Sequence, residues 1–211
     1  MRKLALWLML LPLIVSAQSA DDELVKVKAF IPDIVLDLKY NTSDNFAEQK
    51  LYSTDECFLA LNVVKQLKLV QDSLRMFRQH NGTSYPQGLG LKIWDGYRPR
   101  AVQYLMWEIL PDPTFVADPA TGSSHNRGAA VDVTLVDRAT GEELEMPTCF
   151  DDFSERASHS YSNLPANILA NRELLESIMV DVGGFVIYSA EWWHYSLPAA
   201  AAFPLLDFQP K

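Results

Sequence analysis

Cysteine is scarce in this sequence of 211 residues, which contains only Cys57 and Cys149. The chain can therefore form at most one disulfide, and two separate buried thiols are the alternative. A bridge between the two would close a loop of roughly 90 residues and would stabilise the fold by about 4 kcal/mol. Neither cysteine lies in a sequence setting that indicates a catalytic nucleophile.

Basic residues are also in the minority, since 18 lysines and arginines face 27 aspartates and glutamates, for a formal net charge of −9 at pH 7. An acidic surface repels phosphate groups, so we expect no nucleic acid among its partners. The sequence lacks internal repeats, low-complexity linkers and segments of disordered composition. Its length suits one domain with a hydrophobic core, and two domains would be cramped.

Long apolar runs are missing as well, apart from one near the N-terminus. The run over residues 4–15 follows two basic residues and is too short to span a membrane, which takes roughly 20 apolar residues. The small residues after it fit cleavage after Ala17, with Ala20 as a second site. We predict a signal peptide over residues 1–17 and an exported domain, periplasmic or secreted, over residues 18–211, with no stable membrane insertion. An uncleaved membrane anchor is the alternative.

Hydrophobic periodicity predicts helices and strands in mixed order. A capping box over residues 53–56 and apolar residues at helical spacing predict a long helix that ends at Asn81. Further helices are predicted over residues 99–110 and 165–180. Strands are predicted over residues 89–93, 130–136, 185–188 and 192–196. Because this order shows no regular βαβ alternation, we predict an α+β fold, with a mainly antiparallel sheet and flanking helices in a single domain.

Histidine is the second scarce residue, and the four present are His80, His125, His159 and His194. His80 falls at the predicted end of a helix, where a structural or solvated role is expected. His159 lies in a polar segment, and we do not assign it to a metal. The other two are accompanied by carboxylates, and these segments carry the chemical signal of the sequence.

Asp132 follows His125 by seven residues and lies on the polar face of an otherwise apolar strand. A buried carboxylate requires a partner or a cation, and imidazole with carboxylate is a typical beginning of a zinc site. Gly128 between them allows the tight turn that brings both groups to one point. A surface histidine beside an unrelated aspartate is the alternative that spacing alone leaves open.

Glu191 and His194 form a second polar pair, among tryptophans. A catalytic zinc takes three protein ligands and keeps one position open, and His125, Asp132 and His194 would make that set. Glu191 would then take a proton from the attacking water. Because residues i and i+3 face opposite sides of a flat strand, we expect Glu191 on a bend or loop before the strand.

Arg98 stands in a third segment, WDGYRP, directly after a predicted strand. A fixed guanidinium can stabilise the oxyanion that develops on a scissile carbonyl. Taken alone, an arginine in this position is more often part of a surface ion pair.

The three segments together resemble one family of enzymes. Their motifs are SxHxxGxAxD from Ser123, ExWH from Glu191 and WDGYRP from Trp94. This combination resembles the zinc D-alanyl-D-alanine dipeptidases of vancomycin resistance and their bacterial relatives, within a larger group that includes D,D-carboxypeptidases and hedgehog-like domains. The resemblance extends from about Asp37 to Phe208.

The resemblance implies a metallopeptidase that splits D-alanyl-D-alanine, a small D-amino-acid dipeptide, with one Zn²⁺ per chain. It implies that His125, Asp132 and His194 are the zinc ligands. It further implies that Glu191 is the general base and that Arg98 stabilises the transition state.

The same resemblance implies three substrate contacts. Asp151 would hold the free amino group of the dipeptide, Ser123 would help to bind its carboxylate, and Tyr40 would lie near the pocket. A D,D-carboxypeptidase or endopeptidase acting on longer cell-wall peptides is one alternative, and it would need no amine-binding carboxylate. A non-catalytic metal-binding recognition module is the other.

Overall fold

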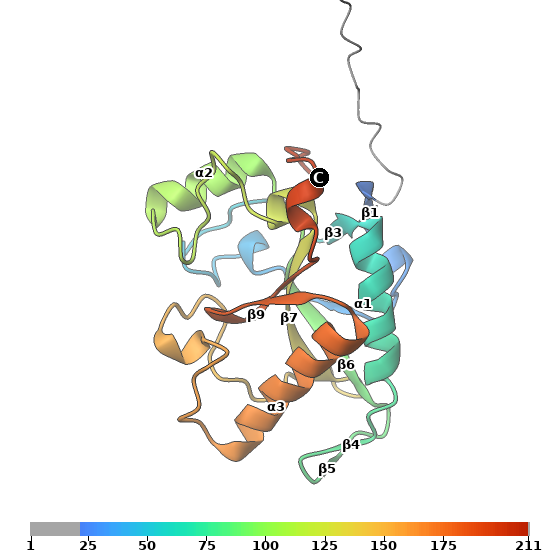
Figure 1. Ribbon diagram of the computed structural model, residues 1–211. Helices are drawn as coiled ribbons and strands as arrows, with labels where there is room; N and C mark the ends of the chain where they lie inside the picture. The colour runs from blue at the N-terminus through green and yellow to red at the C-terminus, as the bar shows by residue number, and fades with distance from the viewer. Residues whose placement is uncertain (1–21, 211) are drawn as a thin grey trace, which may run out of the picture.

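The centre of the fold is a five-stranded sheet with the strand order β2–β6–β7–β9–β8 (Figure 1). The computed structural model describes residues 22–210, so the signal peptide predicted over residues 1–17 lies outside the described residues. β2 is parallel to β6, and the other neighbouring strands are antiparallel. The strands span Val35–Leu36 (β2), Leu89–Asp95 (β6), Ala130–Asp137 (β7), Val186–Tyr188 (β8) and Glu191–Ser196 (β9). The predicted α+β fold with a mainly antiparallel sheet is confirmed.

The core lies where β6 and β7 meet the helices. Alternate residues of these strands are fully buried, among them Leu91, Ile93, Val131, Val133 and Leu135. Helix α1 (Leu61–Leu74) contacts β6, and helix α3 (Ala166–Ser177) contacts β7. Helix α2 (Arg100–Ile109) lies on the other side of the molecule from α1 (Figure 1). The apolar faces of α1 and α3 thus pack on the sheet, and α2 packs elsewhere on the core through Val102 and Met106.

The first helix begins later than the sequence predicts. Residues Phe58–Ala60 form strand β3, which pairs with β1 (Leu24–Lys26), and α1 starts only at Leu61. The predicted capping residues form a local turn instead, in which Thr54 Oγ1 accepts the N–H of Glu56 at 3.1 Å. Pairing with a distant strand therefore overrides the local helical signal at this end.

The same helix also ends earlier than predicted, at Leu74. The residues that follow form a hairpin of β4 (Gln79–His80) and β5 (Thr83–Ser84), and Asn81 in its turn has a φ of 50°. Asparagine and glycine tolerate this left-handed region, which a two-residue hairpin turn requires. The prediction that His80 lies at a helix end is therefore wrong, because it belongs to β4.

The remaining elements agree with the sequence pattern. α2 and α3 occupy most of the ranges predicted for them, and a short π-helical segment, Ile178–Val182, continues α3. β8 and β9 are the predicted closing pair. Single 3-10 turns occupy Val27–Ala29, Lys39–Asn41, His125–Arg127, Glu155–Ala157 and Ala200–Ala202.

Both cysteines are free thiols in this structure, so the disulfide that the sequence allows between Cys57 and Cys149 is not formed, and only one of the two thiols is buried. Cys57 is buried beneath Gly96, where a Cβ on the glycine would come within 2.5 Å of its sulfur. Cys149 is exposed, beside the loop that carries Asp151. The tight packing of Cys57 under the backbone of Gly96 keeps its sulfur in the interior, away from an exposed partner.

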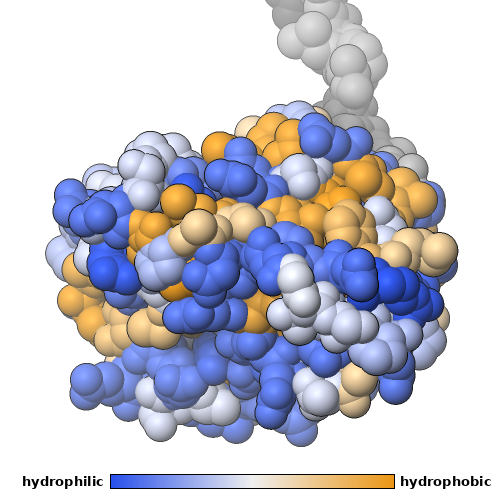
Figure 2. Space-filling model, turned by 90° about the horizontal axis from the view of Figure 1, so that it is seen from below, coloured by the Kyte–Doolittle hydropathy of each residue, from blue (hydrophilic) through white to orange (hydrophobic). Residues whose placement is uncertain are grey.

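Hydrophilic side chains cover much of the face shown in Figure 2, with apolar groups interspersed among them. Within residues 22–210, every helix falls short of the length and apolar character required to cross a bilayer.

Candidate active site

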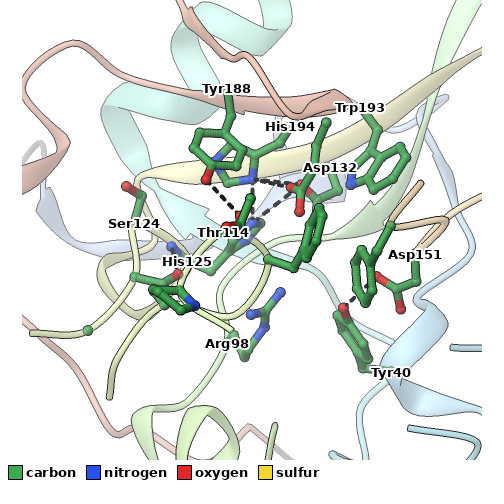
Figure 3. Close-up of a pocket in the computed structure, with 17 residues that line it drawn as sticks. Tyr40, Arg98, Thr114, Ser124, His125, Asp132, Asp151, Tyr188, Trp193 and His194 are labelled. Atoms are coloured by element: carbon green, nitrogen blue, oxygen red, sulfur yellow. Dashed lines mark hydrogen bonds and ion pairs between the residues drawn. The ribbon is translucent and has the colours of Figure 1, made fainter. Parts of the chain in front are cut away.

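A cavity of about 260 Å³ opens beside β7 and β9, which contribute Asp132 and His194 to its wall. It collects every residue that the sequence analysis assigned to the metal, to catalysis or to the substrate. These residues are Tyr40, Arg98, Ser123, His125, Asp132, Asp151, Glu191 and His194. They come from both halves of the chain, and the fold brings them to one place (Figure 3).

Strand register explains how two of the three predicted metal ligands meet. Asp132 on β7 is the direct partner of His194 on β9, so their side chains share one face of the sheet. His125 reaches the same point from the 3-10 turn before β7. Gly128 closes that turn with a φ of 63°, as the sequence predicted for a tight turn. We call His125, Asp132 and His194 the metal triad.

The donor atoms of the metal triad converge closely enough to hold one ion. His125 Nε2 lies 3.3 Å from Asp132 Oδ1 and 3.1 Å from His194 Nδ1, and His194 Nδ1 lies 3.0 Å from Asp132 Oδ1. A four-coordinate zinc with bonds of about 2.0–2.2 Å keeps its ligands roughly 3.3 Å apart. His125 Nδ1 donates to the Gly96 carbonyl at 2.7 Å, which leaves the lone pair on Nε2 facing the triad. The residues present therefore fit a zinc site.

The charges within the triad are coupled. Burial alone would raise the pKa of Asp132, but His125 and His194 outweigh burial and hold that pKa well below its ordinary value. Burial lowers the pKa of His194. Burial also lowers the pKa of His125, but the neighbouring Asp132 carboxylate outweighs it and raises that pKa overall. Asp132 is therefore an anion, as a metal ligand must be.

Glu191 stands beside the triad without joining it. Its Oε2 lies 3.9 Å from His194 Nδ1, and the side chain is buried. Glu191 is the first residue of β9, not a loop residue before it, and the register of β8 with β9 shifts beside it, between Ile187 and Tyr188. The pKa of Glu191 is raised well above its ordinary value. Burial is the largest cause, and the negative charges of Asp132 and Asp151 add to it. A carboxylate whose pKa is raised holds a proton more strongly than an ordinary glutamate does, which suits a general base.

Arg98 is fixed under the cavity by a carboxylate that the sequence analysis did not identify. Its Nε and Nη2 donate to Asp95 Oδ2 at 3.0 and 2.7 Å, and its Nη1 donates to Gln103 Oε1 at 3.1 Å. Tyr52 Oη donates to the other oxygen of Asp95 at 2.7 Å. Burial lowers the pKa of Arg98, but Asp95 outweighs it and keeps the guanidinium charged. These bonds use three of its five N–H donors, so two are left for a ligand.

The Asp151 carboxylate lies at one side of the triad, paired with Tyr40 (Figure 3). Tyr40 Oη donates to Asp151 Oδ1 and the backbone N–H of Phe46 donates to Oδ2, both at 3.0 Å. Burial raises the pKa of Asp151 to about 7 despite these two donors. The backbone of Asp151 has a φ of 58°, in the left-handed region. The fold therefore holds this acid in an uncommon conformation beside the cavity, as functional sites often do.

Ser123 shapes the turn that presents His125. Its Oγ accepts the N–H of His125 at 3.0 Å, and its own N–H donates to Asn126 Oδ1 at 2.8 Å. Ser123 lines the cavity, and because its Oγ is an acceptor in this bond, its hydroxyl proton is not used in it. The neighbouring Ser124 lies on the opposite side of the triad from Asp151 (Figure 3).

Two histidines lie outside the metal triad. His80 Nε2 is 2.9 Å from Asn171 Oδ1, and His159 Nδ1 pairs with Glu176 Oε2 at 2.8 Å. Neither lines the cavity.

Several residues of the cavity were not identified from the sequence. They are Thr114 and Phe115 of the loop after α2, Phe153, and Tyr188 of β8. Asp95, which holds Arg98 without lining the cavity itself, was missed as well. Asp95 stands in the WDGYRP motif, three residues before Arg98, and that spacing was the available signal. The others carry no local signal, because their contacts join segments far apart in the chain.

Comparison with known proteins shows similarity across nearly all of the described chain. The profile of a family described as D-ala-D-ala dipeptidase matches residues 20–209. A D-alanyl-D-alanine dipeptidase of Escherichia coli (strain K12) is 38% identical over 187 residues, which are 89% of this chain and 91% of that protein. A D-alanyl-D-alanine dipeptidase of Enterococcus faecium is 34% identical over 179 residues, which cover 76% of this chain and 84% of that protein. A D-alanyl-D-alanine dipeptidase of Streptomyces coelicolor (strain ATCC BAA-471 / A3(2) / M145) is 34% identical over 194 residues, which cover 80% of this chain and 90% of that protein.

Proposed function

The chain belongs to the D-Ala-D-Ala dipeptidase family of peptidases, and from that premise we propose that it hydrolyses D-alanyl-D-alanine to two D-alanines in a zinc-dependent reaction. The observation that carries the proposal is the cavity itself. It unites the metal triad with a buried acid, Glu191, a fixed guanidinium, Arg98, and a second acid, Asp151, at one side. Held by the triad, a Zn²⁺ ion would act as a Lewis acid on the peptide carbonyl and make water more acidic.

Glu191 moves the protons of the reaction. It accepts a proton from the water that attacks the peptide carbonyl, and it returns that proton to the departing amine as the C–N bond breaks. The support for this role is its buried position, with Oε2 3.9 Å from His194 Nδ1 of the metal triad. Arg98 stabilises the negative charge that develops on the carbonyl oxygen, because it lines the cavity while Asp95 holds its guanidinium rigid.

Asp151 and Ser123 orient the dipeptide. The ammonium group of the substrate pairs with Asp151, because burial makes this carboxylate costly to ionise alone and a neighbouring positive charge stabilises it. The carboxylate of the substrate accepts a hydrogen bond from the Ser123 hydroxyl. Because Asp151 and the serine segment lie on opposite sides of the triad, the scissile bond falls between them (Figure 3). Tyr40 orients Asp151 through its hydroxyl.

The test is hydrolysis of D-Ala-D-Ala by purified protein, with added zinc and with chelator, beside N-acetyl-D-Ala-D-Ala. We expect cleavage of the free dipeptide alone and loss of that activity with chelator. Equal cleavage of the acetylated peptide would reassign the protein to the D,D-carboxypeptidases, since an acetyl group removes the charge that Asp151 recognises. A protein that binds zinc and cleaves neither peptide would be an endopeptidase or a recognition module, and the dipeptidase proposal would fail.

We also propose that the mature enzyme works outside the cytoplasm, on peptides derived from the cell wall. The support is the N-terminal segment, where a basic start and an apolar run over residues 4–15 precede small residues. Expression of the full chain in a bacterial host, followed by fractionation and N-terminal sequencing, tests this. Mature protein beginning at residue 18 or 21 in the periplasm or medium is expected, and uncleaved protein in the cytoplasm would contradict the proposal.

A further inference from the structure

A short turn forms a roof over the cavity. The turn, over residues 112–116, is closed by its own hydrogen bonds. The Asp112 carboxylate accepts the N–H of Thr114 at 2.9 Å, and the Asp112 carbonyl accepts those of Phe115 and Val116 at 3.0 and 2.8 Å. Val116 is only 2% exposed and anchors the end of the turn in the core. We call this preformed unit the roof turn.

The roof turn is tied to the cavity wall at two points. Tyr188 Oη on β8 donates to the Thr114 carbonyl at 2.6 Å, which joins the turn to the sheet edge (Figure 3). The ring of Tyr188 also lies edge-on to His194 of the metal triad, with ring centroids 5.8 Å apart. At the second point, Phe115 stacks on Phe153, with centroids 4.6 Å apart and ring planes inclined by 23°. The turn is thus held over the triad and over the segment that carries Asp151.

Three aromatic rings form a row beside the Asp151 carboxylate. Phe46, whose N–H donates to Asp151, packs against Phe153 with ring centroids 5.5 Å apart, and Phe153 in turn stacks on Phe115. Phe115 and Phe153 both line the cavity. A substrate whose amino group reaches Asp151 therefore ends at this row. Any residue attached to that amino group would need the space that the stacked rings occupy.

We propose that Phe115, held in place by the roof turn, sets the length of the substrate by closing the cavity beyond the amino group. The inference rests on the proposed dipeptidase function and names the residue that excludes a longer peptide. A tripeptide positioned to release its last residue would place its first residue against the Phe115–Phe153 stack. A free dipeptide avoids this contact and keeps its ammonium on Asp151. Tyr188 contributes by fixing the roof turn that carries Phe115.

The test compares D-Ala-D-Ala with Gly-D-Ala-D-Ala, which retains a free amine but extends one residue further. Wild-type protein and the Phe115→Ala, Phe115→Leu and Tyr188→Phe variants are assayed with zinc, and products are identified by mass. We expect Phe115→Ala to raise the ratio of kcat/KM for the tripeptide over the dipeptide by about tenfold or more, with Gly-D-Ala and D-Ala as products. Phe115→Leu, which keeps most of the bulk, and Tyr188→Phe, which frees only the turn, should each give a smaller increase.

Phe30→Ala is the matched control, because Phe30 is 42% exposed and does not line the cavity. Its ratio of kcat/KM for the tripeptide over the dipeptide should equal that of the wild type. An unchanged ratio in Phe115→Ala and Phe115→Leu, with dipeptide still cleaved, would overturn the role of Phe115 and leave the dipeptidase function standing. Efficient cleavage of the tripeptide by the wild type would also overturn the role of Phe115 and leave the dipeptidase function standing. A wild type that cleaves no dipeptide would overturn both proposals together.

Discussion

Two buried carboxyl groups share the cavity but have different surroundings. Glu191 lies next to the metal triad, where burial and the carboxylates of Asp132 and Asp151 raise its pKa. Asp151 receives hydrogen bonds from Tyr40 and Phe46, yet burial still raises its pKa to about 7. The first group is suited to proton transfer and the second to recognition of a cation. Each assignment leads to a separate prediction.

Replacement of Glu191 by glutamine should separate catalysis from metal binding. The amide has nearly the same size but cannot accept a proton, so Glu191→Gln should lower kcat for D-Ala-D-Ala by about 10²–10⁴-fold. Zinc content should stay at the wild-type level, because the three donor atoms of the triad do not include Glu191. Metal analysis and steady-state kinetics on the same preparation measure both quantities. Retained turnover would exclude Glu191 as the base.

Replacement of Asp151 by asparagine should change how stability depends on pH. The raised pKa means that the folded protein binds this proton more tightly than the unfolded chain does. Stability is therefore highest below the unfolded pKa of 3.8 and is lost as pH rises toward about 7. Asparagine does not ionise, so Asp151→Asn lacks this loss of stability. The free energy of unfolding of the variant minus that of the wild type should therefore increase by a few kcal/mol from pH 4 to pH 8.

Urea denaturation at those two pH values, with zinc present throughout, measures the difference for Asp151→Asn. The absolute stability of the variant is a poorer guide, because asparagine cannot accept both hydrogen bonds that Tyr40 and Phe46 donate. Asp152→Asn is the control, since its carboxylate only accepts the N–H of Ser154 in an exposed turn. A stability difference independent of pH would contradict the raised pKa of Asp151.

At the scale of elements, the turn before β7 determines whether the metal triad forms. Gly128 ends this turn at a φ of 63°. A Cβ at this position would come within 2.5 Å of Leu24 on β1 and 3.1 Å of the Ala60 backbone nitrogen on β3. The turn that presents His125 therefore packs directly against the small sheet formed by β1 and β3. Crowding at this contact would shift a metal ligand as well as the backbone.

We predict that Gly128→Ala destabilises the protein by about 1–3 kcal/mol or more and also weakens zinc binding. Gly141→Ala is the control that separates backbone strain at a positive φ from steric crowding of the added Cβ. Its φ is similarly positive at 76°, but a Cβ there meets nothing within 4 Å. The control should lose less stability and bind zinc as the wild type does. Chemical denaturation and zinc titration measure the two effects. Equal losses in both variants would show that backbone strain alone, and not packing against β1 and β3, determines the outcome.

At the scale of the whole molecule, the metal triad joins parts of the chain that are distant in sequence. His194 is 62 residues from Asp132 and 69 from His125. An ion bound by all three stabilises the folded state only, because the unfolded chain does not hold these groups together. Zinc binding and global stability should therefore be coupled.

We predict that zinc raises Tm and that chelator lowers it. At a free zinc concentration of 100 times Kd, the stabilisation is about 2.7 kcal/mol. His194→Ala should abolish the zinc-induced rise, since it removes one of three ligands. His80→Ala should retain the rise, because His80 pairs with Asn171 away from the cavity. Thermal denaturation with and without zinc measures the shift. A full shift in His194→Ala would remove His194 from the ligand set.

Local sequence determined much of the candidate site. The spacing of His125, Gly128 and Asp132 predicted a turn that leads into a strand, and the structure contains both. Alternation of apolar residues likewise predicted β6, β7 and the closing pair β8 and β9. These features depend on neighbours within a few residues, where backbone geometry fixes the direction of each side chain.

Only the tertiary structure decided the rest, because the deciding contacts join distant residues. Tyr52 supports Asp95 across 43 positions, and Tyr188 holds Thr114 across 74. Strand pairing of Phe58–Ala60 with Leu24–Lys26 shortened a helix that local periodicity favoured. Burial of Cys57 beneath Gly96 placed its thiol away from the exposed Cys149. The sequence by itself thus determined which polar side chains are available to the cavity. Long-range packing decided what supports these side chains and what closes the cavity above them, because such contacts depend on how separate elements pack together.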